Sequence, residues 1–348
     1  MVVEESEGST WPMSRSVNRQ SSLIGVVLSV PVLLTGLLLV GPSDPLSADV
    51  QASAVENSST QTFQEWQVLE VKTARTVSFQ VWMTELASSD VIYLGEEHRN
   101  RSHVEAALKI LDALLARDRR PVLAIEMFGW DGQAGLDRYL SDQETTRDRF
   151  LQESRWEQNW GGAYDDYEPL INFARERHLS VLALNPPRSL VRRVATQGLA
   201  RALADPDMNR WGMRNELLFD EPTYRDVILK QLRLCHTGLS GEDYRRMYEA
   251  SIFRDEGMAK TISAHLGNAR AGVGPVVSYT GSGHIQYRLP VPNRVQRRRT
   301  GVVKQTTVYL TSVEPGRAEE IRELLRDAVA DYVWLTPLSA HGAPRQCR

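Results

Sequence analysis

Val91-Ile92-Tyr93-Leu94-Gly95-Glu96-Glu97-His98 is the stretch that decides the fold, because an apolar run here ends in a glycine turn that carries a histidine. The pattern occurs again where Val276-Val277-Ser278-Tyr279 leads into Gly281-Ser282-Gly283-His284. In an open parallel α/β sheet, the loops that follow the strands gather at the carboxyl edge, where ligands bind. We therefore expect these two Gly-x-x-His turns, which are far apart in the sequence, to lie close together in space.

A third apolar run, Val122-Leu123-Ala124-Ile125, brings Glu126 to its end. A carboxylate in that place must be hydrogen-bonded, metal-bound or neutral, because an unpaired buried charge is costly. Between the first and third runs, Ser102-His103-Val104-Glu105 matches a capping box, and apolar residues at three-and-four spacing follow it. A strand, a helix and a strand in this order predict an α/β fold with a mainly parallel sheet flanked by helices.

The remaining pattern predicts a smaller helical part within the α/β fold. Residues 189–266 contain no convincing strand pattern, and we interpret them as an inserted helical subdomain. The α/β domain then comprises residues 55–188 and 267–338, and residues 339–348 form a polar tail that we expect to be disordered. Further strands are expected at residues 181–184, 306–310 and 331–335.

The amino-terminal part carries a membrane-type signal. Residues 23–40 form an uncharged apolar run that follows Arg15 and Arg19. A helix of this length spans about 27 Å, close to the roughly 30 Å of a bilayer core. We interpret residues 1–54 as a secretory signal or membrane anchor with a linker. By the positive-inside rule, the rest of the chain is expected to be exported, either periplasmic or anchored facing outside the cytoplasm.

Composition and missing motifs exclude several classes of protein. The formal net charge is −3, so no overall field favours nucleic acid as a partner. The two cysteines have no Cys-x-x-Cys spacing, which excludes a cysteine-rich zinc site. The sequence has no His-Glu-x-x-His, Gly-x-Ser-x-Gly or Walker A motif, and no Gly-x-Gly-x-x-Gly after a strand. These absences argue against zincin proteases, classical serine hydrolases, NTPases and dinucleotide enzymes.

The candidate site consists of Glu96, His98, Glu126 and His284. Imidazole and carboxylate groups suit a divalent metal ion, and they can also polarise a carbonyl or deprotonate a water. A single histidine after a strand is more often a structural hydrogen-bonding group, but the pairing of two such turns favours a functional role. Arg188 follows a double proline, so we expect it on a stiff loop at the same edge.

The segment Trp156-Glu157-Gln158-Asn159-Trp160-Gly161-Gly162 has two open interpretations. Its tryptophans could be core residues that flank a turn, or they could form the wall of a pocket for a flat apolar ligand.

Six short motifs follow one another in a recognisable order. They are residues 91–98, Ile125-Glu126-Met127-Phe128, Ala183-Leu184-Asn185-Pro186-Pro187-Arg188, Arg254-Asp255-Glu256-Gly257-Met258-Ala259, residues 281–284 and Asp331-Tyr332-Val333-Trp334. This order resembles the ChaN-like family of bacterial haem-binding uptake proteins, within the wider Tiki/TraB/erythromycin-esterase superfamily. The resemblance covers roughly residues 75–337.

The resemblance implies an extracytoplasmic haem-binding protein linked to haem and iron uptake. Haem is then the expected cofactor, haem or iron-uptake components are the expected partners, and the chain could pair as a homodimer. A guanidinium can bind a carboxylate bidentately, so Arg188 is the candidate partner of the haem propionates. The candidate iron ligands are His98, His284 and the tyrosines Tyr279, Tyr248 and Tyr287.

The resemblance also leaves an enzyme as the alternative. In some relatives the same motifs serve metal-dependent hydrolysis. In that case Glu96 and Glu126 would be the catalytic groups, and together with His98 and His284 they would hold a divalent metal ion. The two hypotheses differ in an observable, since a haem protein has a Soret band and a hydrolase is colourless.

Overall fold

The computed structural model describes residues 62–268, 274–314 and 316–339. These residues belong to one compact unit. The predicted signal or anchor at residues 1–54 lies outside the described residues, and so does the predicted tail from residue 340 onward. In the part of the chain that is described, no helix has the length and apolar character needed to cross a membrane.

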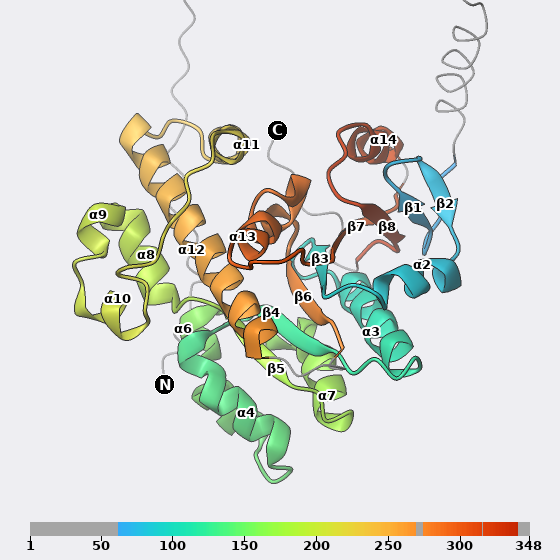
Figure 1. Cartoon of the computed structure of the whole chain (residues 1–348), viewed down its shortest axis with the longest axis horizontal. Coiled ribbons are helices and arrows are strands. Elements are labelled where there is room, and N and C mark those ends of the chain that lie inside the picture. Colours follow the sequence, from blue (N-terminus) through green and yellow to red (C-terminus); the bar gives the residue numbers. More distant parts are fainter. Residues whose placement is uncertain (1–61, 269–273, 315, 340–348) are drawn as a thin grey trace, which may run out of the picture. The chain divides into compact units, whose positions relative to one another are not determined.

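An eight-stranded sheet forms the centre of the described part, in the order β2-β1-β8-β7-β3-β6-β4-β5 (Figure 1). The six strands from β8 to β5 pair in parallel, whereas β1 pairs antiparallel with both β8 and β2. The predicted α/β fold with a mainly parallel sheet is therefore confirmed. The strands are β1 (Val68–Glu70), β2 (Arg75–Val77), β3 (Val91–Glu96), β4 (Val122–Gly129), β5 (Val181–Asn185), β6 (Val276–Gly281), β7 (Gln305–Ser312) and β8 (Tyr332–Thr336).

Helices cover both faces of the sheet, which is why the central strands read as continuous apolar runs. Every residue of β3, β4 and β6 is buried. On one face, Leu94 and Ile125 pack in a core with α2 (Phe79–Leu86), α3 (Arg101–Leu115), α4 (Gln133–Ser141), α5 (Arg147–Glu153), α6 (Trp156–Asn159) and α7 (Glu168–Glu176). On the other face, Tyr93 and Ala124 pack in a second core with α12 (Gly241–Asn268), α13 (Val291–Arg297) and α14 (Ala318–Arg326).

Strand β6 lies between β3 and β4, and this position brings the motifs together. Leu94 of β3 is in register with Tyr279 of β6, and Glu96 is in register with Gly281. On the other side, Ile125 of β4 is also in register with Tyr279. The two Gly-x-x-His turns therefore leave neighbouring strands at the same edge of the sheet.

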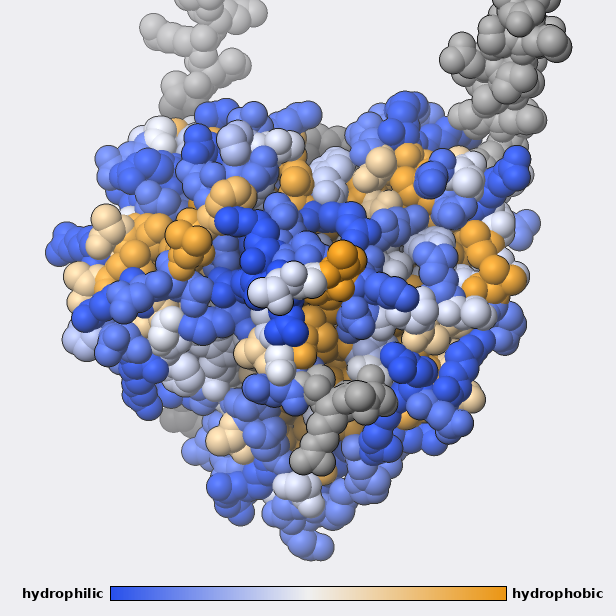
Figure 2. All heavy atoms as spheres, in the orientation of Figure 1, coloured by the Kyte–Doolittle hydropathy of each residue, from blue (hydrophilic) through white to orange (hydrophobic). Residues whose placement is uncertain are grey.

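Residues 189–266 are helical and contain no strand in the structure. Their helices are α8 (Arg188–Gln197), α9 (Leu199–Ala202), α10 (Pro206–Arg210), α11 (Pro222–Cys235) and most of α12. Leu190, Val194, Met208 and Phe253 form an apolar cluster of their own in this region. Helix α12 belongs to both the helical region and the α/β region, because its carboxyl-terminal half packs on the sheet through Met258 and neighbouring residues. Figure 2 shows a mainly hydrophilic face over these elements, with separate small apolar patches.

Two local predictions were wrong. Asn100 rather than Ser102 caps α3, and its side chain accepts a hydrogen bond from the Ser102 N–H. Arg188 does not lie on a stiff loop, since α8 begins at this residue directly after Pro187. A proline disrupts a helix interior, but its missing N–H has no cost at a helix start, where that group has no intrahelical partner.

Candidate functional site

The structure gathers Glu96, His98, Glu126 and His284 at the carboxyl edge of the sheet. Glu96 is the last residue of β3, and Glu126 lies within β4. His284 lies in a single 3-10 turn (Ser282–His284) directly after β6. The four side chains thus lie in or directly after three adjacent strands, as the sequence predicted. The roles of these residues stay a prediction.

Glu96 is a buried carboxylate with three hydrogen-bond donors. His98 Nδ1 lies 2.8 Å from its Oε1, and the Tyr167 hydroxyl donates to the same oxygen at 2.9 Å. The Tyr279 hydroxyl donates to Oε2 at 2.6 Å. Burial raises the pKa of Glu96, and the three donors oppose that rise. Tyr279 is itself fully buried, and its hydroxyl donates to this carboxylate.

His98 presents a partly open imidazole. A carboxylate only accepts, so the bond to Glu96 places a proton on Nδ1. Nε2 carries a lone pair in the neutral form of the ring and a second proton in the charged form. Within the described residues, no group hydrogen-bonds to this Nε2. The side chain is 44% exposed and meets Trp160 edge-on, with the ring centroids 5.0 Å apart. Desolvation lowers the pKa of His98, but the bond to Glu96 and the charge of Glu126 outweigh it, so the pKa is raised.

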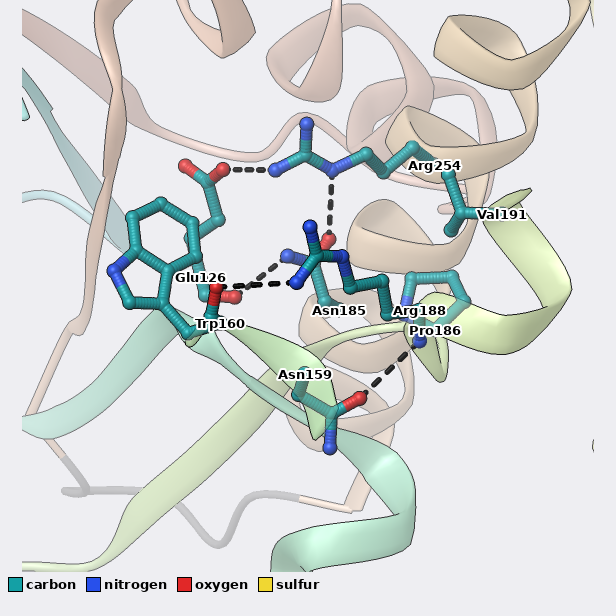
Figure 3. Close-up of a pocket in the computed structure, with 8 residues that line it drawn as sticks. All are labelled: Glu126, Asn159, Trp160, Asn185, Pro186, Arg188, Val191 and Arg254. Carbon is teal, nitrogen blue, oxygen red and sulfur yellow. Dashed lines mark hydrogen bonds and ion pairs between the residues drawn. The ribbon is translucent and has the colours of Figure 1, made fainter. Parts of the chain in front are cut away.

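Glu126 is surrounded by donors and cations. Its Oε2 accepts the Gly281 N–H at 2.6 Å, and its Oε1 pairs with the Arg254 guanidinium (Figure 3). His284 Nε2 lies 3.5 Å from the same Oε1. Burial alone would raise the pKa of Glu126, but Arg254 and His284 hold it well below the usual value. Glu126 is therefore an ionised and fully paired group.

His284 is a cation held between two carboxylates. Its Nδ1 lies 2.5 Å from Asp255 Oδ1, opposite the contact of Nε2 with Glu126. Burial lowers its pKa, but the two carboxylates outweigh burial and raise the pKa to about 9. An imidazolium has no free lone pair, so His284 in this state cannot ligate a metal. Asp255 also accepts the Tyr224 hydroxyl at 2.5 Å, which ties α11 to the site.

A cleft of about 280 Å³ opens beside these groups. The residues that line it, drawn in Figure 3, are Glu126, Asn159, Trp160, Asn185, Pro186, Arg188, Val191 and Arg254. Arg254 Nε donates to Asn185 Oδ1 at 3.2 Å, and Arg188 Nη1 donates to the Trp160 carbonyl at 3.2 Å. Within the described residues no carboxylate pairs with Arg188. The predicted position of Arg188 at this edge therefore holds, although its backbone is helical.

The two tryptophans of the segment 156–162 differ in burial. Trp156 is buried in the core, and its Nε1 donates to the Gly162 carbonyl at 2.7 Å. Trp160 is only partly buried and forms a wall of the cleft beside His98. The core interpretation is therefore confirmed for Trp156. Trp160 lies in the wall of a cleft, and a flat apolar ligand there stays a prediction.

Sequence reasoning missed Arg254, Asp255 and Tyr167 as site residues. Arg254 and Asp255 are consecutive on α12, and they pair with Glu126 and His284 respectively. Their Arg-Asp motif had been noticed only as part of the family resemblance, which was the available signal. Tyr167 precedes α7 and reaches Glu96 from the helical layer, and no pattern in the sequence indicates that contact.

The expected four-residue metal set is not formed in the part of the chain that the structure describes. Across those residues, no group of three or more histidine, cysteine, aspartate or glutamate side chains is arranged to hold a metal ion. The physical reason is that Arg254 and Asp255 occupy the ligating atoms of Glu126 and His284.

Comparisons with known proteins agree with this architecture. The family model described as haem-binding uptake, Tiki superfamily, ChaN matches residues 82–295. The chain is similar to ChaN of Campylobacter jejuni, whose structure shows cofacial haem binding. The TM-score is 0.60 and the identity is 21%, and the similarity covers 79% of this chain and 98% of that chain. A weaker similarity, with a TM-score of 0.42 and 12% identity, links 80% of this chain to 84% of an erythromycin esterase.

A curated relative is a plant protein. The chain is 24% identical over 284 residues to the chloroplastic protein RETICULATA-RELATED 5 of Arabidopsis thaliana. This match covers 77% of the chain and 36% of the relative, so the chain spans about a third of the length of the curated relative it matches.

Proposed function

Because this chain belongs to the haem-binding uptake family of the Tiki superfamily (ChaN), we propose that it binds haem in the cleft at the carboxyl edge of the sheet, with His98 as an iron ligand. The observation that carries this proposal is the state of His98. Its Nδ1 proton is held by Glu96, its Nε2 has no hydrogen-bond partner within the described residues, and its side chain is partly exposed. Haem supplies an iron centre that accepts such an axial ligand.

The other groups of the cleft fit the remaining parts of haem. Trp160, Pro186 and Val191 offer apolar surface to the porphyrin. Arg188 and Arg254 offer guanidinium groups to the propionates, and Arg188 is free of any carboxylate partner among the described residues. The cleft lies just below the usual size of ligand pockets, so haem bound here would keep much of its surface open.

The competing iron ligands are less favourable. His284 is a cation between Glu126 and Asp255, as described above. Tyr279 is buried against Glu96, and the Tyr248 hydroxyl donates to Asp220 at 2.5 Å. Tyr287 lines a separate hollow with Arg317, whereas His98 meets Trp160, a residue of the cleft lining. These places support His98 over the other four candidates.

We also propose a role in haem or iron uptake outside the cytoplasm. The apolar run at residues 23–40 supports export and a periplasmic or membrane-anchored location. The open cleft supports a homodimer, because a second copy could cover the haem face that one cleft leaves exposed. Iron-uptake components would then be the partners that deliver or receive the haem.

A hydrolase is the second candidate, and one observation favours it. His98 and Glu96 form a hydrogen-bonded imidazole–carboxylate pair beside two guanidinium groups, which suits a general base acting on an anionic substrate. In this form Glu96 orients His98. Glu126 would act through Arg254, because its own oxygens are already paired. A divalent metal ion would require Glu126 or His284 to release its present partner.

The test is a haemin titration of the purified chain, followed by absorbance. We expect a saturable Soret shift that His98→Ala weakens by at least tenfold. His178→Asn is the matched control, because His178 is exposed, far from the cleft lining, and has a backbone φ of 52° that asparagine tolerates. A colourless protein that hydrolyses ester substrates would overturn haem binding in favour of the second candidate.

A further inference from the structure

We propose that a second hollow of this chain binds a small organic cation that carries a hydroxyl group, an amino alcohol or its quaternary ammonium form. The hollow measures about 150 Å³ and is walled by β7, α14 and the turn at Tyr287 (Figure 1). The residues of its lining that carry the argument are Tyr287, Tyr309, Arg317, Glu320, Glu323 and Asp327. No residue lines both this hollow and the cleft, so the inference does not rest on haem binding.

The first observation is an excess of negative charge in the hollow. Glu320 is matched by a cation, because its Oε2 lies 2.8 Å from Arg317 Nε. Within the described residues, Glu323 has one exposed contact of 3.8 Å with Arg326 of the same helix, and Asp327 has no ion pair. These two carboxylates are therefore available to a ligand, and their charge favours a cation.

The second observation is that two tyrosine rings line the same hollow. Burial, and then the charge of Asp327, raise the pKa of Tyr287, which places this carboxylate close to the ring. Aromatic faces attract cations, and quaternary ammonium groups are recognised in this way. A metal ion is not the expected cation, because no three acidic, histidine or cysteine side chains of the described part are arranged to hold one.

The third observation indicates an acceptor atom on the ligand. Arg317 is only 7% exposed, and its Nε and Nη2 donate to Glu320 and Glu97. Its Nη1 is buried and has no hydrogen-bond partner within the described residues. An unpaired buried donor is costly, so a ligand oxygen that accepts from Nη1 adds affinity. A hydroxyl oxygen fits better than a third carboxylate, because two carboxylates already contact this guanidinium.

The backbone around the hollow is strained. Tyr287 and Ala328 have left-handed φ values of 55° and 52°, which residues other than glycine rarely adopt. The Tyr287 N–H donates to the Val329 carbonyl at 2.7 Å and joins the two turns. Such strain is typical of ligand-binding segments. The hollow has about half the volume of the smallest usual ligand pockets, so the ligand is a small molecule.

The test is isothermal titration calorimetry of the full chain with choline, which combines a quaternary ammonium group with a hydroxyl. We expect saturable binding. The uncharged isostere of choline, in which carbon replaces nitrogen, should bind about tenfold more weakly, because it loses the carboxylates and the aromatic faces. Tetramethylammonium, which lacks the hydroxyl, should bind about fivefold more weakly, because Arg317 Nη1 then stays unpaired.

Asp327→Asn tests the site on the protein side. Loss of this charge should weaken choline binding about threefold to fivefold, as for an exposed ion pair. Glu319→Gln is the matched control, because Glu319 lies on the same helix but pairs with Arg322 and Arg326 and does not line the hollow. Equal affinities of the wild type and Asp327→Asn, or of choline and its isostere, would overturn the inference. The absence of saturable heat with both choline and ethanolamine would also overturn it.

A lipid head group carries the same chemistry as a free amino alcohol, and one further ligand separates the two sources. Glycerophosphocholine is the soluble head group of the lipid. Affinity equal to that of choline would support a lipid source, whereas affinity about tenfold lower would support a free amino alcohol.

Discussion

His284 Nδ1 lies 2.5 Å from Asp255 Oδ1, and this contact joins the second Gly-x-x-His turn to helix α12. Arg254, which precedes Asp255 in the same helix, pairs with Glu126. Two consecutive residues of α12 therefore pair with Glu126 in β4 and with His284 directly after β6. The helix is held at the sheet edge by charge as well as by apolar packing, and the strength of this attachment depends on the charge of His284.

We expect alkaline pH to weaken the fold through His284. Its pKa is about 9 in the folded protein, against about 6.5 in an unfolded chain. The stabilisation is complete below the unfolded value and is lost as the pH rises through the folded one. Between pH 7 and pH 10 the free energy of unfolding should fall by about 2 to 3 kcal/mol more in the wild type than in His284→Asn. Urea unfolding at both pH values measures this, and equal falls would contradict it.

We expect acid to weaken the fold through a different histidine. His103 is fully buried in α3, and its Nδ1 accepts the Glu97 N–H at 3.0 Å. Burial, and then the charge of Arg317, lower its pKa to about 3. The unfolded chain binds this proton at higher pH than the folded one, so stability is lost as the pH falls below about 6.5. At pH 5 the loss is about 2 kcal/mol.

The control for this acid effect is His103→Asn. The asparagine oxygen can accept the Glu97 N–H in place of Nδ1, but it does not titrate. The free energy of unfolding of this variant should fall about 2 kcal/mol less between pH 7 and pH 5 than that of the wild type. The same fall in both proteins would exclude His103 as the source.

We expect Gly281→Ala to displace His98. A Cβ at Gly281 would lie 2.8 Å from both Nε2 and Cε1 of His98, closer than real contacts allow. The haemin affinity should fall at least tenfold while the unfolding transition of the protein is kept. Gly283→Ala is the control in the same turn, because a Cβ there has nothing within 4 Å. Equal affinities of the two variants would show that His98 does not bind the iron.

We expect Arg188→Gln to weaken haemin binding about tenfold, because an exposed charge-assisted hydrogen bond contributes at the lower end of its range. Haem whose propionates are esterified should bind the wild type and the variant equally, since the anionic partner is gone. Arg192→Gln, an exposed arginine one turn along α8, is the control. If Arg188→Gln lowers the affinity for both forms of haem equally, Arg188 does not bind the propionates.

The central strands could be predicted because they are continuous apolar runs followed by glycine turns. The edge strands β1 and β2 could not, since each has three residues and β2 is largely exposed. The capping residue of α3 was misplaced by two positions, because Asn100 and Ser102 are both good N-cap residues and only the backbone decides between them.

The site was predictable where it depended on strands. Adjacent parallel strands place Glu96 beside Gly281, and the two-residue period also puts Tyr279 on the face of Glu96, a signal that was present but not used. Arg254 and Asp255 could not be placed in this way. Their contacts depend on how α12 is rotated against the sheet, and the apolar periodicity of that long helix is weak.

The position of β6 between β3 and β4 has a consequence for how the protein is made. The ribosome synthesises β3, α3 and β4 long before β6. Until β6 is made, the edges of β3 and β4 that it will pair with have no neighbouring strand. Pairing between segments so distant in the chain is slow to form. Until β6 enters, Glu126 has neither the Gly281 N–H nor His284 as a partner. A newly synthesised chain therefore has to close its sheet before it can hold any ligand at this edge.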